Sequence, residues 1–146
     1  MLATVNDLVE LLEELMPSNL AEDWDNVGLL VGSREKEVKK IMIALDATDA
    51  VIAEAAKEQV DMLITHHPMI FSSMKKINDE DFIGRRIISL IKHDISYYAM
   101  HTNFDVSKMA QLAADKMCLE EVTVLQETQP DLGIGTVGNL PQSISL

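Results

Sequence analysis

The hydrophobic positions near the start of the chain recur at helical spacing. They lie between a Thr4–Asp7 capping signal and Pro17, and they predict a first amphipathic helix. These positions are Leu8, Leu11, Leu12 and Leu15. In residues 22–32, an Asp-Asn turn signal precedes a short apolar run that ends at a glycine, which predicts a loop followed by a strand.

The middle of the chain alternates between apolar runs of strand length and stretches with helical spacing. Residues 41–45 and 60–65 predict strands, and between them Thr48 can cap a helix. A helix over residues 79–92 and a strand over residues 95–100 repeat the unit. Uninterrupted apolar strands separated by helices indicate parallel strands that are buried on both faces. We therefore expect an α/β fold with a mostly parallel sheet flanked by helices.

The pattern continues and then weakens toward the C-terminus. A further helix is expected with Met109, Leu112 and Met117 facing inward, followed by a strand over residues 121–125 that continues the α/β layering. Glycine and proline then become frequent, and we expect turns around a short strand over residues 134–137.

Composition and charge exclude several classes of protein. The 146 residues are 47% hydrophobic and 25% charged, which is typical of a globular domain and not of a disordered chain. The net charge of −12 repels phosphate backbones and anionic lipids, so nucleic acid is disfavoured as a partner. A single cysteine leaves no intramolecular disulfide to form, and no apolar run approaches the roughly 20 residues of a membrane span. We expect a cytoplasmic protein that is not inserted in a membrane.

Histidines and aspartates follow the predicted parallel strands at the point where each strand ends. Asp46 follows the first strand, His66 and His67 the second and His101 the third, with Asp105 four residues further on. The carboxyl ends of parallel strands meet at one edge of a sheet, where ligands bind. Imidazole nitrogens and carboxylate oxygens together suit borderline divalent ions such as zinc, iron and manganese. The pattern favours a metal site in which Asp105 could bridge two ions.

Each of these motifs also has a purely structural interpretation. A His-His pair can be a hydrogen-bonded pair without a metal, and Asp105 can cap the next helix through an Asx-type turn. Asp46 can contact a ligand or form a strand-to-helix turn. His93 is expected to be structural, because it lies at the end of a helix. Trp24 can anchor its loop on the core or line a cleft.

Five segments of the chain resemble the NIF-three-like (YbgI-like) family, which also carries the name GTP cyclohydrolase I type 2. They are EDWDNVGLLVG, IMIALDAT, DMLITHHPMIF, YYAMHTNFD and GIGTVGNLP. The resemblance covers nearly the whole chain. It implies an α/β protein with a dinuclear metal site, assembled as a toroidal hexamer. It also implies that His66, His67, His101 and Asp105 are metal ligands, and it identifies no catalytic residue.

The family that this chain resembles continues past the segment corresponding to residues 138–141. A second lobe follows there, with a GHxxxE motif that supplies another histidine and a bridging glutamate, and this sequence stops before it. We therefore expect residues 1–126 to form a NIF-three-like N-terminal metal-binding lobe. Residues 127–146 are expected to begin the connection to a second lobe that is absent.

Two functions are compatible with these features. The first is a metal-dependent hydrolase with one or two divalent transition metal ions per site, because paired ions generate hydroxide at neutral pH. The family name implies ring opening of a purine nucleotide, although the sequence has no P-loop or GxGxxG motif for phosphates. The alternative is a non-catalytic metal-binding or regulatory protein-interaction module, inactive as truncated. The expected partners are further copies of the chain and a small-molecule or nucleotide substrate.

Overall fold

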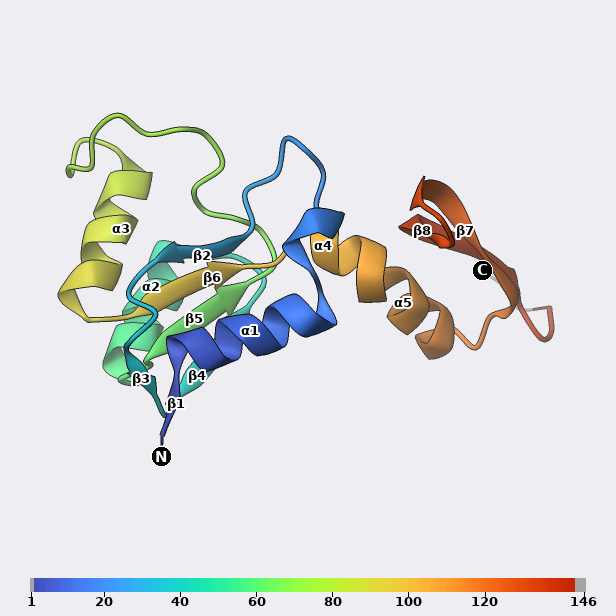
Figure 1. Cartoon of the computed structure of the whole chain (residues 1–146), viewed down its shortest axis with the longest axis horizontal. Coiled ribbons are helices and arrows are strands. Elements are labelled where there is room, and N and C mark those ends of the chain that lie inside the picture. Colours follow the sequence, from blue (N-terminus) through green and yellow to red (C-terminus); the bar gives the residue numbers. More distant parts are fainter. Residues whose placement is uncertain (1, 144–146) are drawn as a thin grey trace.

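A four-stranded sheet organises the N-terminal part of the chain. The computed structural model describes residues 2–143 and orders the strands β2, β6, β5, β4 (Figure 1). Strands β4 (Ile41–Ala44), β5 (Met62–Thr65) and β6 (Ser96–Ala99) are parallel neighbours, and β2 (Gly28–Val31) pairs antiparallel with β6. The predicted mostly parallel α/β fold is therefore confirmed.

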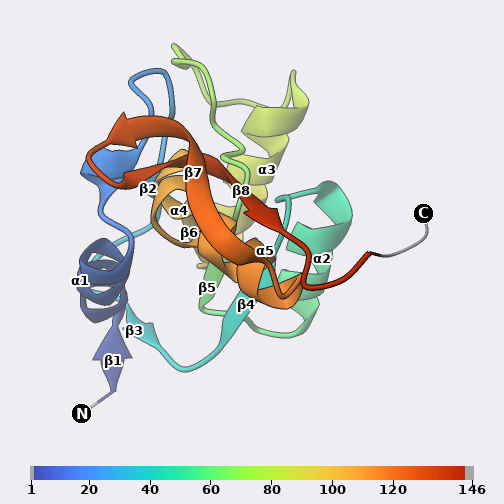
Figure 2. The ribbon, with the colours of Figure 1, turned by 90° about the vertical axis from the view of Figure 1, so that its right-hand side faces the viewer.

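Helices cover the two faces of this sheet. Helix α1 (Val5–Leu15) lies on one face, and α2 (Asp49–Lys57) and α3 (Phe82–Lys92) lie on the other (Figure 2). Successive side chains of a strand point to opposite faces, so Tyr98 packs with α1 while Tyr97 packs with α2 and α3. The two central strands, β5 and β6, are buried along their whole length.

Helix α1 begins where its sequence signal predicts. The Thr4 hydroxyl accepts a hydrogen bond from the Asp7 backbone N–H (3.2 Å), and the Asp7 carboxylate accepts one from the Thr4 backbone N–H (2.7 Å). This reciprocal capping box satisfies two backbone donors that a helix start leaves without partners. Just before it, β1 (Ala3–Thr4) pairs with β3 (Glu37–Val38) in a small separate sheet. A short 3₁₀ helix, Ser18–Leu20, follows α1.

The expectation that β4 is buried on both faces is wrong. Met42 and Ala44 pack against the core on the side of α2 and α3, but the side chains of Ile43 and Leu45 are 73% and 61% exposed. Strand β4 is the edge of the sheet, and α1 packs on β5 and β6. One face of β4 therefore has no helix above it among residues 2–143.

The C-terminal third of the chain departs from the expected layering. Helix α4 (Thr102–Phe104), a π-helical turn (Asp105–Met109) and α5 (Ala110–Lys116) form one helical segment that leads away from the sheet (Figure 1). The side chains of Leu112 and Met117, expected to face inward, are 54% and 59% exposed. Their helical period was correct, but the segment does not lie over the sheet.

The strand expected over residues 121–125 exists but does not join the parallel sheet. It is part of β7 (Glu120–Gln129), which pairs antiparallel with β8 (Leu132–Asn139) in a hairpin. The hairpin turns at Asp131, whose positive φ of 62° suits a tight reversal. Because the connection between β7 and β8 is short, β7 pairs with its neighbour in sequence and not with the parallel sheet. The hairpin includes residues 126 and 127, between which the N-terminal lobe was expected to end.

None of the helices formed by residues 2–143 is long and apolar enough to cross a membrane.

Candidate metal centre

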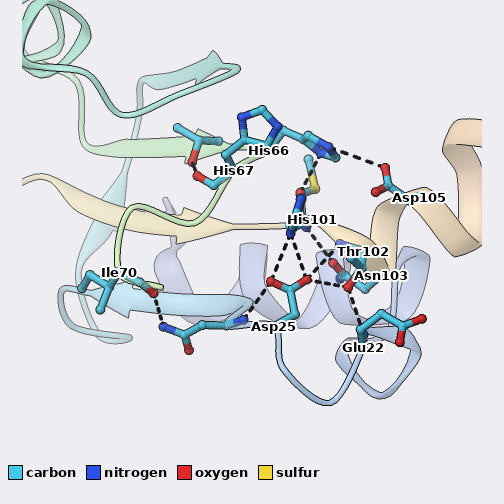
Figure 3. Close-up of polar contacts among 12 residues, drawn as sticks. Glu22, Asp25, His66, His67, Ile70, His101, Thr102, Asn103 and Asp105 are labelled. Atoms are coloured by element: carbon cyan, nitrogen blue, oxygen red, sulfur yellow. Dashed lines mark hydrogen bonds and ion pairs between the residues drawn. The ribbon is translucent and has the colours of Figure 1, made fainter. Parts of the chain in front are cut away.

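Three histidines meet where the parallel strands β5 and β6 end. His66 and His67 directly follow β5, and His101 follows β6 after one intervening residue, Met100. The parallel pairing places Thr65 opposite Ala99, so the residues that follow these positions emerge side by side (Figure 3). One ligating nitrogen from each ring lies within 4.8 Å of those of the other two. The predicted convergence of the three histidines at the sheet edge is therefore present.

An oxygen atom contacts the Nδ1 atom of each of these rings. The Met100 carbonyl oxygen lies 3.1 Å from Nδ1 of His66, and an Asp46 carboxylate oxygen lies 2.8 Å from Nδ1 of His67. Both carboxylate oxygens of Asp25 lie 3.1 Å from Nδ1 of His101. An oxygen acceptor favours a proton on Nδ1, so Nε2 of each neutral ring carries the free lone pair. This arrangement is typical of histidines that ligate metals through Nε2.

Asp25 is the most enclosed carboxylate of the site. Its side chain is fully buried, and it accepts hydrogen bonds from the Thr102 backbone N–H (3.0 Å), the Thr102 hydroxyl (2.5 Å) and the Asn26 backbone N–H (2.8 Å). Burial by itself raises the pKa of this carboxyl. The hydrogen bonds from Thr102, His101 and Asn26 together outweigh burial, so its pKa lies below the ordinary value. Asp25 is therefore a buried anion that holds His101 in place.

In the sequence, Asp25 is recognisable only as part of a turn signal. Its contact with His101 joins residues 76 positions apart, and no local pattern reports such a pairing. The one usable signal was that Asp25 stands between Trp24 and Asn26 in a segment of the family resemblance. Asp46, for which a ligand contact and a simple turn were both open, touches His67 and so borders the site.

Asp105 lies beside the three histidines without joining their closest group. One of its carboxylate oxygens is 3.5 Å from Nε2 of His66. It is the first residue of the π-helical turn and so lies inside a helical segment. Wide turns of this kind frequently occur at functional sites. Asp105 thus faces the nitrogen of His66 that the Met100 contact leaves free.

Two other residues singled out in the sequence lie outside this cluster. His93 ends α3, and its Nδ1 contacts the Ser89 carbonyl oxygen (2.9 Å), which agrees with a structural role. Trp24 does not insert into the core. Its side chain is 56% exposed and lies beside Phe71 and His101.

The fold and the cluster together define an α/β protein with a histidine–carboxylate site at the carboxyl edge of its sheet. The sequence model of Duf34/NIF3 (NGG1p interacting factor 3) matches residues 3–146. The chain belongs to this family, which confirms the resemblance inferred from its motifs.

Sequence relatives and a solved structure agree with this assignment. The chain is 47% identical over 104 residues to a "GTP cyclohydrolase 1 type 2 homolog" of Clostridium perfringens, a match covering 71% of this chain and 40% of the relative. A protein of the same name from Clostridium acetobutylicum is 38% identical, with 97% of this chain and 55% of the relative covered. The structure of a Bacillus cereus protein related to NIF3 superposes with a TM-score of 0.82 at 36% identity, covering 88% of this chain and 36% of that one. The chain therefore spans about half or less of the length of these relatives.

Proposed function

We propose that this chain binds a divalent transition metal ion through His66, His67, His101 and Asp105, and that the bound ion serves a hydrolytic reaction. The observation that carries the proposal is the convergence of three imidazoles whose Nδ1 atoms all contact oxygen. The Nε2 lone pair of each ring is then free to bind a metal, and one ring nitrogen of each histidine lies within 4.8 Å of those of the other two. Zinc, iron and manganese are the ions that such nitrogen and oxygen donors suit.

The residues around the histidines fit a cation. Asp25, Asp46 and Asp105 each lie within 3.5 Å of a ring nitrogen of the cluster. Their negative charges favour a positive ion, and Asp25 and Asp46 also hold the ring protons on Nδ1. A divalent ion bound here would act as a Lewis acid toward a water molecule and a carbonyl oxygen of the substrate. The role of the chain itself is to orient the rings before the ion binds.

The reaction is inferred from the family. The relatives named above are called homologues of GTP cyclohydrolase 1 type 2, which supports a small-molecule or nucleotide substrate and ring opening by water. This chain spans 55% or less of their lengths, so the hydrolytic step is proposed for the site and not for this chain in isolation. A cytoplasmic location and a homo-oligomeric, hexameric assembly remain predictions.

One feature favours the second candidate function, a metal-binding protein-interaction module. Apolar side chains are exposed on β4 and α5 and just after each of them, among them Ile43, Leu45, Leu112 and Met117. A cavity of about 670 Å³ between α5 and β8 is lined mainly by apolar residues. Exposed apolar surfaces of this kind mark protein contact sites.

Metal affinity tests the first part of the proposal directly. We expect the full chain to bind Co²⁺ or Zn²⁺ with a stoichiometry of one or more by isothermal titration and elemental analysis. His66→Ala, His101→Ala and Asp105→Ala should weaken binding strongly. His93→Ala is the matched control, since this histidine lies outside the cluster, and it should bind like the unchanged chain. Equal binding by His66→Ala and His93→Ala would refute the site.

Turnover separates the two functions. Metal-dependent ring opening of GTP, followed by absorbance, supports the hydrolase. If the chain binds metal without turnover, and a full-length relative also shows none, the interaction module is favoured. In that case, partner capture that survives alanine at both His66 and His67 would show that the metal is irrelevant to the interaction.

A further inference from the structure

Two exposed aromatic side chains lie against each other beside the histidine cluster. The side chains of Trp24 and Phe71 are 56% and 54% exposed, and their ring centroids are 5.8 Å apart. Large aromatic rings are normally buried for most of their area, because they gain more than other residues from leaving water. A pair left in solvent therefore has the surface that a ligand could cover.

Hydrogen bonds fix the position of this pair on two separate loops. Asp25, next to Trp24, is buried and bonded to Thr102 and His101. Asn26 donates its side-chain N–H to the carbonyl oxygen of Ile70 (2.5 Å), the residue before Phe71 (Figure 3). The two loops are thus tied together by a hydrogen bond between residues 44 positions apart, each within two residues of one of the aromatic side chains. A surface held in this way loses little conformational freedom when it binds a ligand.

The pair adjoins the candidate metal centre. The centroid of the Trp24 ring lies 6.1 Å from that of His101, with the two rings nearly perpendicular. His101 is in turn 5.1 Å from His66 and 5.5 Å from His67, measured between ring centroids. A molecule that reaches the histidines with one polar group can therefore rest a flat apolar portion on Trp24 and Phe71.

We propose that Trp24 and Phe71 form the binding wall for a flat heteroaromatic ring of purine size. Stacking on aromatic side chains tolerates different bases, because every base has a π-face. The wall therefore recognises ring shape, while the histidine cluster recognises the polar substituent of the ring. The inference deepens the proposed function by naming the ligand class of the same site, and ring stacking itself needs no metal.

The charge of the chain sets a second requirement on the ligand. The net charge is −12, and the carboxylates of Asp25, Asp46 and Asp105 border the cluster. Phosphate groups would be repelled by this field. We therefore expect the metal-free chain to bind a neutral nucleoside at least as well as the corresponding triphosphate.

The test uses the full chain after metal removal with EDTA. Trp24 is the single tryptophan, so its fluorescence reports binding at the wall itself. Guanosine and adenosine should both quench it saturably and with similar affinities. Phe71→Ala should weaken both by roughly 5- to 150-fold, the range expected when one stacking ring is removed. Trp24→Phe, measured by isothermal titration, should keep most of the affinity that Trp24→Ala loses.

Matched measurements separate this inference from its alternatives. Ile91→Ala removes an equally exposed apolar side chain from α3 and should leave nucleoside affinity unchanged. Co²⁺ affinity should be unchanged in Phe71→Ala, and Co²⁺ binding by the unchanged chain reports on the metal proposal separately. Nucleoside binding without Co²⁺ binding would support the ring-binding wall and refute the metal site.

Three results would contradict the proposed binding wall. The first is the absence of saturable quenching up to millimolar nucleoside. The second is equal nucleoside affinity in Phe71→Ala and the unchanged chain. If Trp24→Ala and Phe71→Ala instead change only the oligomeric state in sedimentation experiments, the pair is a protein contact and not a ring-binding wall.

Discussion

Replacing Asp25 by asparagine should separate the folding role of this carboxylate from its control of His101. The wild-type carboxylate is fully buried, and its two oxygens accept all the hydrogen bonds that reach it from Asn26, Thr102 and His101. Asn keeps the shape but replaces one oxygen by an NH₂ group. Nδ1 of His101 lies 3.1 Å from both carboxylate oxygens, so if the remaining oxygen accepts from Thr102, that oxygen and the new NH₂ group compete for Nδ1. Where the NH₂ group donates to Nδ1, the imidazole proton moves to Nε2, the atom proposed to bind the metal.

The expected size of the effect follows from these contacts. Hydrogen bonds to a charged acceptor contribute about 1.5–3 kcal/mol each, against about 0.5–1.5 kcal/mol for neutral ones. In Asp25→Asn, the new NH₂ group can also face the Asn26 backbone N–H, so that two hydrogen-bond donors oppose each other. We expect the free energy of unfolding to fall by roughly 2–4 kcal/mol. Metal affinity should fall about 10- to 100-fold, as is usual when the residue that orients a metal-binding histidine is changed.

Urea unfolding and Co²⁺ titration measure the two effects, and Asp46→Asn is the matched control. Asp46 makes the equivalent contact with His67, but its side chain is 50% exposed. Its replacement should cost about 1 kcal/mol or less, because a polar contact that is half exposed to solvent contributes little. If Asp25→Asn leaves both stability and Co²⁺ affinity unchanged, or if Asp46→Asn is equally destabilising, the role assigned to Asp25 is wrong.

The difference in unfolding free energy between the wild type and Asp25→Asn should depend on pH in one direction. The pKa of Asp25 is lowered in the folded chain, so the unfolded chain takes up a proton first as the pH falls. The contribution of Asp25 to the stability of the folded chain is therefore complete above the ordinary carboxyl pKa, and it is lost as the pH falls below that value. The stability difference between the wild type and Asp25→Asn should shrink over that acidic range.

Three further changes test the packing, each by urea unfolding. Ser96→Ala should be neutral or stabilise by about 1 kcal/mol, because the buried Ser96 hydroxyl has no hydrogen-bond partner within residues 2–143; a clear loss of stability would contradict this. Gly84→Ala should destabilise by about 1–3 kcal/mol, although alanine favours helices, because its Cβ would clash with the Asn78 carbonyl oxygen. A stabilised variant would show that the Asn78 loop moves aside. Burial and the nearby Glu13 raise the pKa of Tyr98 to about 12, so the free energy of unfolding should fall by roughly 2–3 kcal/mol as the pH rises from about 10 to 12. Tyr98→Phe should remove most of that dependence.

Local sequence determined the elements and one edge of the site. The capping box at Thr4, the helical period before Pro17 and the apolar run of β5 act over a few residues, and the structure contains the elements they predict. The sequence placed His66 and His101 together because each lies just after a predicted parallel strand, and the pairing of β5 with β6 brings those ends side by side. The strand period and the parallel direction that it implies suffice for that inference.

Tertiary structure decided which apolar faces are covered and which groups surround the histidines. An exposed β4 face and an exposed α5 face have the same local pattern as buried ones, so periodicity alone could not distinguish them. Asp25 became a brace for His101, and Trp24 a neighbour of Phe71, only through contacts between segments 76 and 44 residues apart. Periodicity reports which side of an element is apolar. What lies against that side depends on how distant segments pack, and no local pattern contains that information.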